Sequence, residues 1–567
     1  MSDTSSTPLS RRQWVGLTMP VLAASLGSGL IGASRASAAE PPAVPADDAK
    51  TAGTRVYNVR DFGAKGDGAT LDTAAIQAAI DACNRDHGGI VLLPAGDFLS
   101  GTIELKSDVT LHLAAAGRLL GSGKIEDYHA GNGLPRNNGN VVLISAANAE
   151  NITLEGHGTI DGQGAKFYTG HGDSTGPGDD RSKAYVDRPH LMTFYRCKNL
   201  VVRDVFCTSS AYHCMRIYEC LYVQLAGVRI HNRVNKNNDG FHFDSSQYVH
   251  VANCDVACQD DACALFGSCK FITVTNCTFS TRWSVFRFGG GQAENITVSN
   301  CVIYETYGCP IKMHFGRNSR AENITFSNLI MKDVTGPISL GLDSRSRRRP
   351  DSDSTPPPKG ILRNITFSGI RATVVATVRQ HADLPFPSDG RPGETRTCIV
   401  LNGATEDCIL ENISLSDVHV IYEGSGTAEE AARRDVPPIA GEYFEIGTPP
   451  AYGLFARNVQ GLTLQNIRFE VTSPDLRPAL VLDHVADAAI NGLSVQGHEK
   501  GESVLRLIAT RDTLLTAARV LTPAPVFLQL EGATSENITV DGGDLTKATA
   551  PLAFKSGATD EAVKLRT

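Results

Sequence analysis

The tripeptide Asn-Ile-Thr recurs along this chain and constrains its fold more than any other feature. Copies begin at Asn151, Asn295, Asn323, Asn364 and Asn537. Apolar and polar residues then alternate, as in residues 296–303, and a period of two is that of a strand with one buried face. Weaker copies of the pattern occur as well, and the equivalent aliphatic residues Val249, Ile272 and Ile296 are 23 and 24 residues apart. That spacing is typical of one coil of a parallel β-helix.

The sequence therefore predicts an all-β protein, a right-handed single-stranded parallel β-helix over residues 55–545. Polar insertions such as residues 344–350 are expected to form loops at the coil corners. Residues 72–83 predict an amphipathic helix that caps the open end of the solenoid, with Asp72 at its N-cap and apolar residues at 75, 76, 79 and 80. The alternation fades after Val540, so residues 546–567 are interpreted as a C-terminal tail.

Two residue types repeat with the coils. Cys254, Cys277 and Cys301 each follow an asparagine at intervals of 23 and 24 residues, which predicts a buried ladder of reduced thiols rather than disulfide bridges. Several Asn-Ile-Thr copies match the glycosylation sequon. We interpret the asparagine instead as a turn residue whose side-chain amide bonds the neighbouring coil.

The first residues have the pattern of an export signal. Arg11 and Arg12 form a twin-arginine signature, an apolar stretch covers residues 15–31, and Ala36-Ser37-Ala38 is a small-x-small cleavage site. We predict a signal peptide at 1–38, a linker at 39–54, and a mature protein in the bacterial periplasm or secreted. No later segment has the length and apolarity of a membrane span.

The net charge of the chain limits the classes of molecule that it can bind. The formal net charge of −8 argues against nucleic acid, which requires a basic face. An acidic protein can bind an acidic glycan only through a local cationic patch. The chain is expected to be a monomer.

Acidic residues concentrate on two adjacent coils. Asp239 and Asp260 are 21 residues apart, close to one coil, and Asp261 follows directly. Stacked coils lie about 4.8 Å apart, so these carboxylates should meet on one face. Crowded carboxylates raise at least one pKa, and glycoside hydrolysis needs one acid and one base. Solvated turn aspartates or a calcium site would be the alternatives, and three aspartates at this spacing favour catalysis.

The segments 237–240 and 260–261 resemble the Asn-x-Asp-Gly turn and the Asp-Asp pair of glycoside hydrolase family 28, the polygalacturonases and rhamnogalacturonases. Residues 56–63, 156–164 and 449–457 extend the resemblance. It implies that Asp260 is the general acid, that Asp239 and Asp261 hold the attacking water, and that the anomeric centre is inverted. It also implies no metal or other cofactor, and a pectic plant polysaccharide or oligosaccharide as the substrate.

Two motifs depart from that family. Its Gly-His-Gly is replaced by residues 282–289, with Ser284 nearest the histidine position, and its Arg-Ile-Lys is replaced by Pro310-Ile311-Lys312. The alternation predicts that Phe286 and Phe288 point to the core and Arg287 to the groove. The candidates for a rebuilt substrate-binding subsite are Arg282, Arg287, Lys312 and His314, with His213 and Arg216 one coil before Asp239.

Two other functions stay open at this point. A polysaccharide lyase on the same fold would use calcium, or an arginine or lysine base, and would form unsaturated uronates that absorb ultraviolet light. A non-catalytic β-helix would bind pectin without releasing reducing ends.

Overall fold

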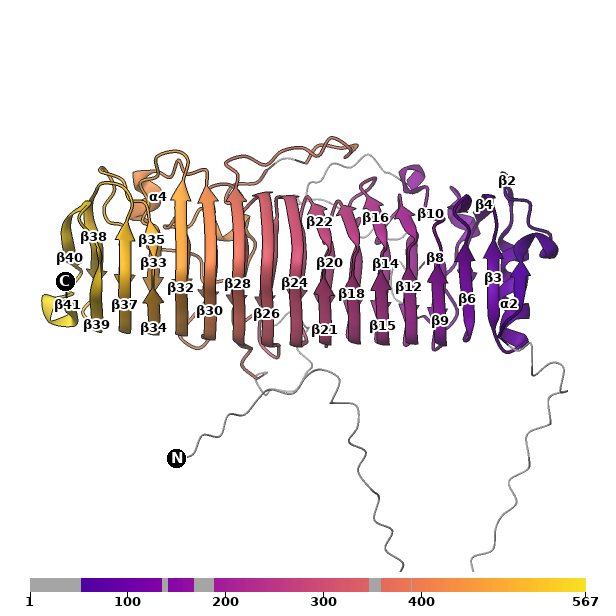
Figure 1. Cartoon of the computed structure of the whole chain (residues 1–567), viewed down its shortest axis with the longest axis horizontal. Coiled ribbons are helices and arrows are strands. Elements are labelled where there is room, and N and C mark those ends of the chain that lie inside the picture. Colours follow the sequence, from indigo (N-terminus) through magenta and orange to yellow (C-terminus); the bar gives the residue numbers. More distant parts are fainter. Residues whose placement is uncertain (1–52, 135–140, 168–187, 346–357, 389, 567) are drawn as a thin grey trace, which may run out of the picture. The chain divides into compact units, whose positions relative to one another are not determined.

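The computed structural model describes residues 53–134, 141–167, 188–345, 358–388 and 390–566. The predicted signal peptide and nearly all of the predicted linker lie outside the described residues. In the described part, strands from successive coils stack into two sheets whose paired strands run parallel (Figure 1). The predicted fold, a single-stranded parallel β-helix, is confirmed.

The smaller sheet has fifteen strands and carries the candidate site. In chain order its strands are β5 (Ile103–Glu104), β8 (Val142–Ala147), β11 (His190–Tyr195), β14 (Met215–Tyr218), β17 (Phe241–Asp244), β20 (Cys263–Phe266), β23 (Ser284–Gly289), β25 (Cys309–Phe315), β27 (Ile338–Leu342), β29 (Ile399–Gly403), β31 (Leu454–Arg457), β33 (Leu480–Asp483), β36 (Leu505–Ile508), β38 (Ala524–Glu531) and β40 (Ala548–Lys555).

The larger sheet has 26 strands. They are β1 (Val56–Asn58), β2 (Asp67–Leu71), β3 (Gly89–Leu93), β4 (Gly96–Ser100), β6 (Val109–Leu113), β7 (Gly117–Gly121), β9 (Glu150–Glu155), β10 (Thr159–Asp161), β12 (Lys198–Arg203), β13 (Phe206–Thr208), β15 (Leu221–Ala226), β16 (Arg229–Asn232), β18 (Gln247–Ala252), β19 (Asp255–Cys258), β21 (Lys270–Thr275), β22 (Thr278–Thr281), β24 (Gln292–Thr306), β26 (Arg320–Val334), β28 (Ile361–Val374), β30 (Leu410–Tyr422), β32 (Val459–Val471), β34 (Ala486–Asn491), β35 (Ser494–Val495), β37 (Arg511–Val520), β39 (Glu536–Asp544) and β41 (Val563–Arg566).

The repeated asparagines form the ladder that the sequence predicts. The side-chain amide of Asn323 donates to Asn295 at 3.2 Å, that of Asn364 donates to Asn323 at 3.1 Å, and that of Asn412 donates to Asn364 at 3.1 Å. These residues have φ between 53° and 58°, a left-handed conformation that asparagine tolerates better than most residues. The Asn therefore fixes each turn and ties it to the next coil.

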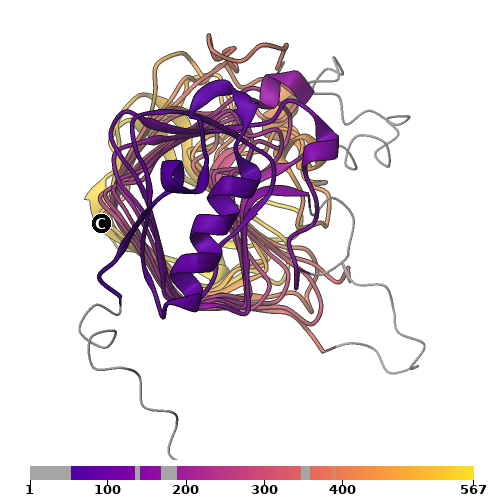
Figure 2. The ribbon, with the colours of Figure 1, turned by 90° about the vertical axis from the view of Figure 1, so that its right-hand side faces the viewer.

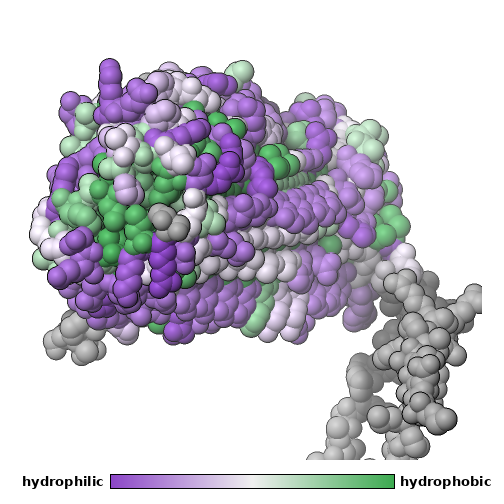
Figure 3. Space-filling view, turned by 60° about the vertical axis from the view of Figure 1, so that its left-hand side comes forward, coloured by the Kyte–Doolittle hydropathy of each residue, from purple (hydrophilic) through white to green (hydrophobic). Residues whose placement is uncertain are grey.

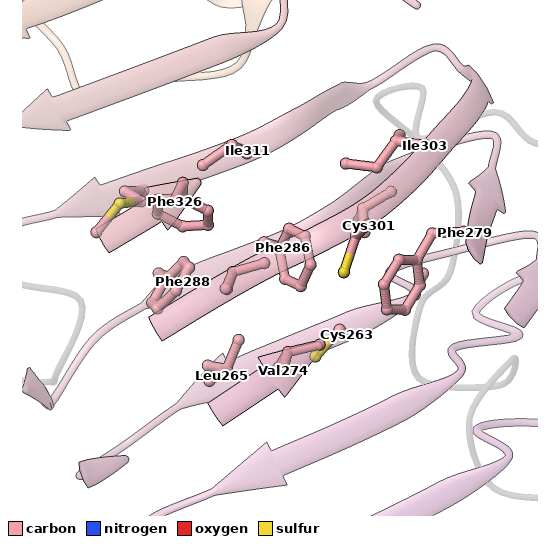
Figure 4. Close-up of a cluster of buried hydrophobic side chains, with 14 of the residues drawn as sticks. Cys263, Leu265, Val274, Phe279, Phe286, Phe288, Cys301, Ile303, Ile311 and Phe326 are labelled. Carbon is pink, nitrogen blue, oxygen red and sulfur yellow. The ribbon is translucent and has the colours of Figure 1, made fainter. Parts of the chain in front are cut away.

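The interior of the solenoid is filled by the inward residues of both sheets. Phe286, Phe288 and Ile311 are fully buried there with Cys263 and Leu265 (Figure 4). A buried side chain of this size contributes roughly 1.5–3 kcal/mol to stability. All fourteen cysteines lie in the described part of the chain, and all are buried free thiols, as the stacked pattern predicts.

A helix closes the N-terminal end of the stack. Helix α2 (Thr73–Arg85) lies across the first coils, with Ile76, Ala79 and Ile80 buried beneath it (Figure 2). Asp72 is its N-cap residue but makes no side-chain bond to the helix. Its carboxylate instead accepts from the backbone N–H groups of residues 65 and 66, at 2.7 and 2.9 Å. It therefore holds the preceding turn.

The solenoid continues beyond the boundary that the sequence predicts at residue 545. Strand β40 pairs with β38 and β41 pairs with β39. The alternation fades because no residue of β40 is fully buried, and Phe554 is 36% exposed. Hydrophobic side chains gather on this end of the stack, which faces forward in Figure 3.

The other helices of the described residues are short. Helices α4 (Ala428–Ala432) and α5 (Tyr443–Ile446) lie in the long connection between β30 and β31. The 3₁₀ turns in this part of the chain cover Val59–Phe62, Ile125–Asp127, Gly164–Phe167 and Asp560–Ala562. Among the described helices, none is long and apolar enough to cross a membrane.

Candidate active site

Asp239 and Asp261 lie side by side just before strands β17 and β20. Phe241 pairs with Cys263, and the backbone N–H of Gly240 donates to the carbonyl of Asp261 at 3.0 Å. Residue 239 therefore stands beside residue 261 on the next coil, and neighbouring strands are about 4.8 Å apart. The offset is 22 residues rather than the 21 that separate Asp239 from Asp260, so Asp261 is the direct neighbour.

Asp260 lies at the same edge of the sheet. One of its carboxylate oxygens accepts from the backbone N–H of Asp261 at 2.9 Å, and the other accepts from the side-chain amide of Asn237 at 3.3 Å. Asp260 and Asp261 are half-buried, whereas Asp239 is 5% exposed. The structure thus brings the three predicted carboxylates together on adjacent coils.

The surroundings push two of these carboxylates toward their protonated forms. Burial raises the pKa of Asp239 well above its ordinary value, and the neighbouring Asp261 raises it further. Burial also raises the pKa of Asp261, although the charges of Lys312 and Arg287 oppose the shift. A site of this kind can hold a proton near neutral pH and still contain an ionised carboxylate.

An imidazole that the sequence analysis did not select is bonded to Asp239. His242 Nδ1 lies 2.7 Å from Asp239 Oδ2, and His213 Nε2 lies 3.7 Å from Asp239 Oδ1. Burial lowers the pKa of His242 to about 4 and lowers the pKa of His213. Burial thus favours an Asp239–His242 pair without net charge, in which the carboxyl is protonated and the imidazole is neutral. The alternation around His242, between the inward Phe241 and Phe243, was the signal that could have found it.

His213, Asp239 and His242 are also residue types that bind metal ions. Among the described residues, the ligand atoms of His213, Asp239 and His242 all lie within 4.8 Å of one another. The two imidazole rings, however, stack with centroids 4.6 Å apart and planes 19° apart. Lone pairs in nearly parallel planes do not converge on one ion, and Nδ1 of His242 already serves the bond to Asp239. The geometry suits a hydrogen-bonded pair better than a chelate.

Two of the predicted cations lie beyond Asp261 on the outward face of the sheet. Arg287 of β23 pairs in register with Lys312 of β25, while Phe286 and Phe288 are fully buried on the inward face. Arg287 therefore lies on the face opposite the two phenylalanines, where it is 8% exposed. Both cations contact Glu442, the N-cap residue of α5. Lys312 Nζ lies 2.7 Å from Glu442 Oε2, and Arg287 Nη2 lies 3.9 Å from Oε1.

Glu442 was missing from the sequence analysis, because it comes from a loop insertion 130 residues away from Lys312. No feature of the repeat pattern indicates where such an insertion packs. Burial alone would raise the pKa of Glu442, but Lys312 and Arg287 outweigh that effect and hold it at about 2. The carboxylate is therefore ionised at any physiological pH.

Two other residues predicted to bind substrate, Arg282 and His314, are buried. The Arg282 side chain is 1% exposed, and its Nη2 lies 2.9 Å from Glu394 Oε2 in a buried ion pair. His314 is 1% exposed, and its Nε2 lies 2.9 Å from the hydroxyl of Ser339. Ser284 is fully buried on the inward face of β23, so it does not take the place of the family histidine. Arg282 and His314 therefore have almost no exposed surface with which to contact a substrate.

Arg216 lies on the other side of the carboxylates. It pairs in register with His242, and its Nε donates to the hydroxyl of Tyr218 at 2.8 Å. Its charge lowers the pKa of Asp239, against the larger effect of burial. Arg216 and His213 thus stand near Asp239, as the coil spacing predicts.

A parallel β-helix with three carboxylates gathered at one edge of a sheet defines a class of solenoid enzymes suited to acid/base cleavage of glycans. Residues 83–384 match the family Glycosyl hydrolases family 28. The chain belongs to this family and is a glycoside hydrolase.

Relatives of known name agree with this assignment. The chain is 25% identical over 379 residues to polygalacturonase-2 of Solanum lycopersicum, which covers 64% of this chain and 79% of that protein. It is 33% identical over 255 residues to exo-poly-alpha-D-galacturonosidase of Dickeya chrysanthemi, covering 37% and 42% of the two chains. The family 28 exopolygalacturonase structure from Yersinia enterocolitica has the same fold, with a TM-score of 0.54, 21% identity, and coverage of 76% and 78%.

Proposed function

We propose that this protein hydrolyses glycosidic bonds in a pectic glycan that contains galacturonate, with inversion of the anomeric centre. Asp260 acts as the general acid, and Asp239 with Asp261 activates water. The observation that carries the proposal is the register in which Asp239 stands beside Asp261, together with the bond from the backbone N–H of Asp261 to the Asp260 carboxylate.

The chemistry follows from these roles. Asp260 gives its proton to the glycosidic oxygen as the carbon–oxygen bond breaks, and the leaving sugar departs as an alcohol. A water held by Asp239 and Asp261 attacks the anomeric carbon from the opposite face and transfers one proton to this pair. His242, bonded to Asp239 at 2.7 Å, orients that carboxylate and is a positioning residue.

The substrate class rests on the relatives. Proteins named polygalacturonase and exo-poly-alpha-D-galacturonosidase match this chain over its β-helix. Arg216 beside the carboxylates provides cationic character on the Asp239 side of the groove. The experiment below also distinguishes hydrolysis from cleavage by a lyase and from binding without cleavage.

The location follows from the substrate. A pectic polysaccharide lies outside the bacterial cell, so we propose export through the twin-arginine signature at residues 11–12, and action as a monomer. Replacement of Arg11 and Arg12 by lysine should retain the protein in the cytoplasm. Export of that variant at the native level would contradict this route.

The experiment uses the purified mature chain on polygalacturonate and on galacturonate oligomers. Reducing ends should appear without a rise in ultraviolet absorbance, and a chelator should leave the rate unchanged. Absorbance that rises with cleavage would indicate a lyase. Binding of pectin without release of reducing ends would indicate a non-catalytic protein.

A further inference from the structure

The two cations beyond Asp261 are already occupied by a carboxylate of the chain itself. The side chains of Lys312 and Arg287 are 4% and 9% exposed, and Glu442 contacts both, at 2.7 and 3.9 Å. In a galacturonate-cleaving groove such a cation pair would be expected to bind the carboxylate of the sugar. Here Glu442 takes that position.

The segment that carries Glu442 is fastened to the solenoid. The carboxylate of Asp343 accepts from the backbone N–H of Ala440 at 2.9 Å, and the buried hydroxyl of Tyr443 donates to the carbonyl of Gly336 at 2.9 Å. These bonds flank Glu442 on both sides in the sequence. These bonds hold the backbone around Glu442 in place beside the two cations.

Arg287 and Lys312 already interact with two acids of the chain, Glu442 and Asp261. Glu442 is ionised, whereas burial raises the pKa of Asp261. His242 adds no charge near neutral pH, because burial lowers its pKa to about 4. A uronate placed here would bring a second ionised carboxylate beside Glu442, which already contacts both cations, in a poorly hydrated site, and this is unfavourable.

A further cation, Arg391, lies close to this position. Its guanidinium lies over the rings of Trp283 and Phe444, 4.9 and 4.6 Å from their centroids, and Lys312 Nζ is 5.9 Å from the centroid of the same Trp283 ring. The specificity inferred below concerns only the position over Arg287 and Lys312, and other sugars of the same glycan can be uronates.

We propose that the subsite over Arg287 and Lys312 accepts an uncharged sugar, and that Glu442 determines this specificity. The substrate would then be a galacturonate-containing glycan with a neutral sugar, or a galacturonate whose carboxyl is masked, next to the cleaved bond. This inference rests on the proposed function and narrows its substrate class.

The test compares polygalacturonate with the same polymer after partial reduction of its carboxyl groups, which replaces carboxylates by hydroxymethyl groups without added bulk. The native protein should have a kcat/KM about tenfold higher on the partly reduced polymer, the effect of one unfavourable charge contact. Glu442→Gln frees the two cations and should shift the preference toward polygalacturonate by about the same factor.

The matched control is Asp435→Asn. Asp435 lies in the same loop as Glu442, and its side chain is 95% exposed. It should leave the preference unchanged. A native preference for unmodified polygalacturonate would overturn the inference, and so would a Glu442→Gln variant with the native preference. If Glu442→Gln does not fold, the native comparison decides alone. Cleavage of neither polymer would count against the proposed function instead.

Discussion

The Asp239 carboxylate and the His242 imidazole share a hydrogen bond of 2.7 Å, three residues apart on one coil. Replacement of His242 by alanine should lower kcat by roughly 10- to 100-fold, because Asp239 loses the partner that orients it. The acidic limb of the pH profile should also move, which a purely structural defect would not cause. His250→Ala, at an exposed histidine on neighbouring β18, is the control and should have native kinetics. An unchanged kcat for His242→Ala would remove His242 from the mechanism.

The buried pair of Arg282 and Glu394 is predicted to stabilise the fold. Arg282→Met should lower the melting temperature strongly, because it leaves Glu394 buried without its partner, and such losses typically cost about 3–5 kcal/mol. The double variant Arg282→Met with Glu394→Met should recover much of the loss, which thermal unfolding can measure. If Arg282→Met keeps the native melting temperature and weakens substrate binding instead, Arg282 is a substrate contact after all.

The fold could be predicted from the sequence because of the repeat. Asn295, Asn323 and Asn364 mark the turns because a left-handed turn conformation and a ladder of amide bonds both favour asparagine, and both effects are local. The spacing of Asp239 and Asp261 follows from the same period, so the acidic centre of the site could also be predicted.

The positions of the loop insertions could not be predicted from the repeat. Glu394 bonds Arg282, which is 112 residues away in the sequence. Glu442 bonds Lys312, which is 130 residues away. Their positions depend on how irregular segments pack on the finished solenoid, and no periodicity records that. The sequence makes both Arg282 and Arg287 candidates for the same subsite, although Arg282 pairs with Glu394 and Arg287 lies near Glu442.

The charges around Asp261 predict opposite pH shifts in two variants. Lys312 stabilises the ionised form of Asp261, so Lys312→Met should raise its pKa and move the acidic limb of kcat/KM to higher pH. Glu442 destabilises that form, so Glu442→Gln should move the limb to lower pH. The pH profiles of both variants and of the Asp435→Asn control give the measurement. Shifts in the same direction would contradict the assignment of Asp261 to the water-activating pair.

The role of Asp260 is tested by Asp260→Asn, which keeps the shape of the side chain and removes its acid function. Turnover should fall by about 10²-fold or more, while the melting temperature and the circular dichroism spectrum stay close to native. A variant that retains activity would transfer the general-acid role to another residue. Asp255→Asn, at an exposed aspartate on the adjoining β19, should leave turnover unaffected.

The anomeric configuration of the first product tests the central claim most directly. The claim is that a water held between carboxylates attacks opposite the leaving group, while a separate acid protonates that group. Proton NMR recorded during early turnover on a galacturonate oligomer should show the new reducing end in the configuration opposite to that of the cleaved linkage. A first product with the configuration retained would mean that a carboxylate attacks the sugar itself, and would contradict the account.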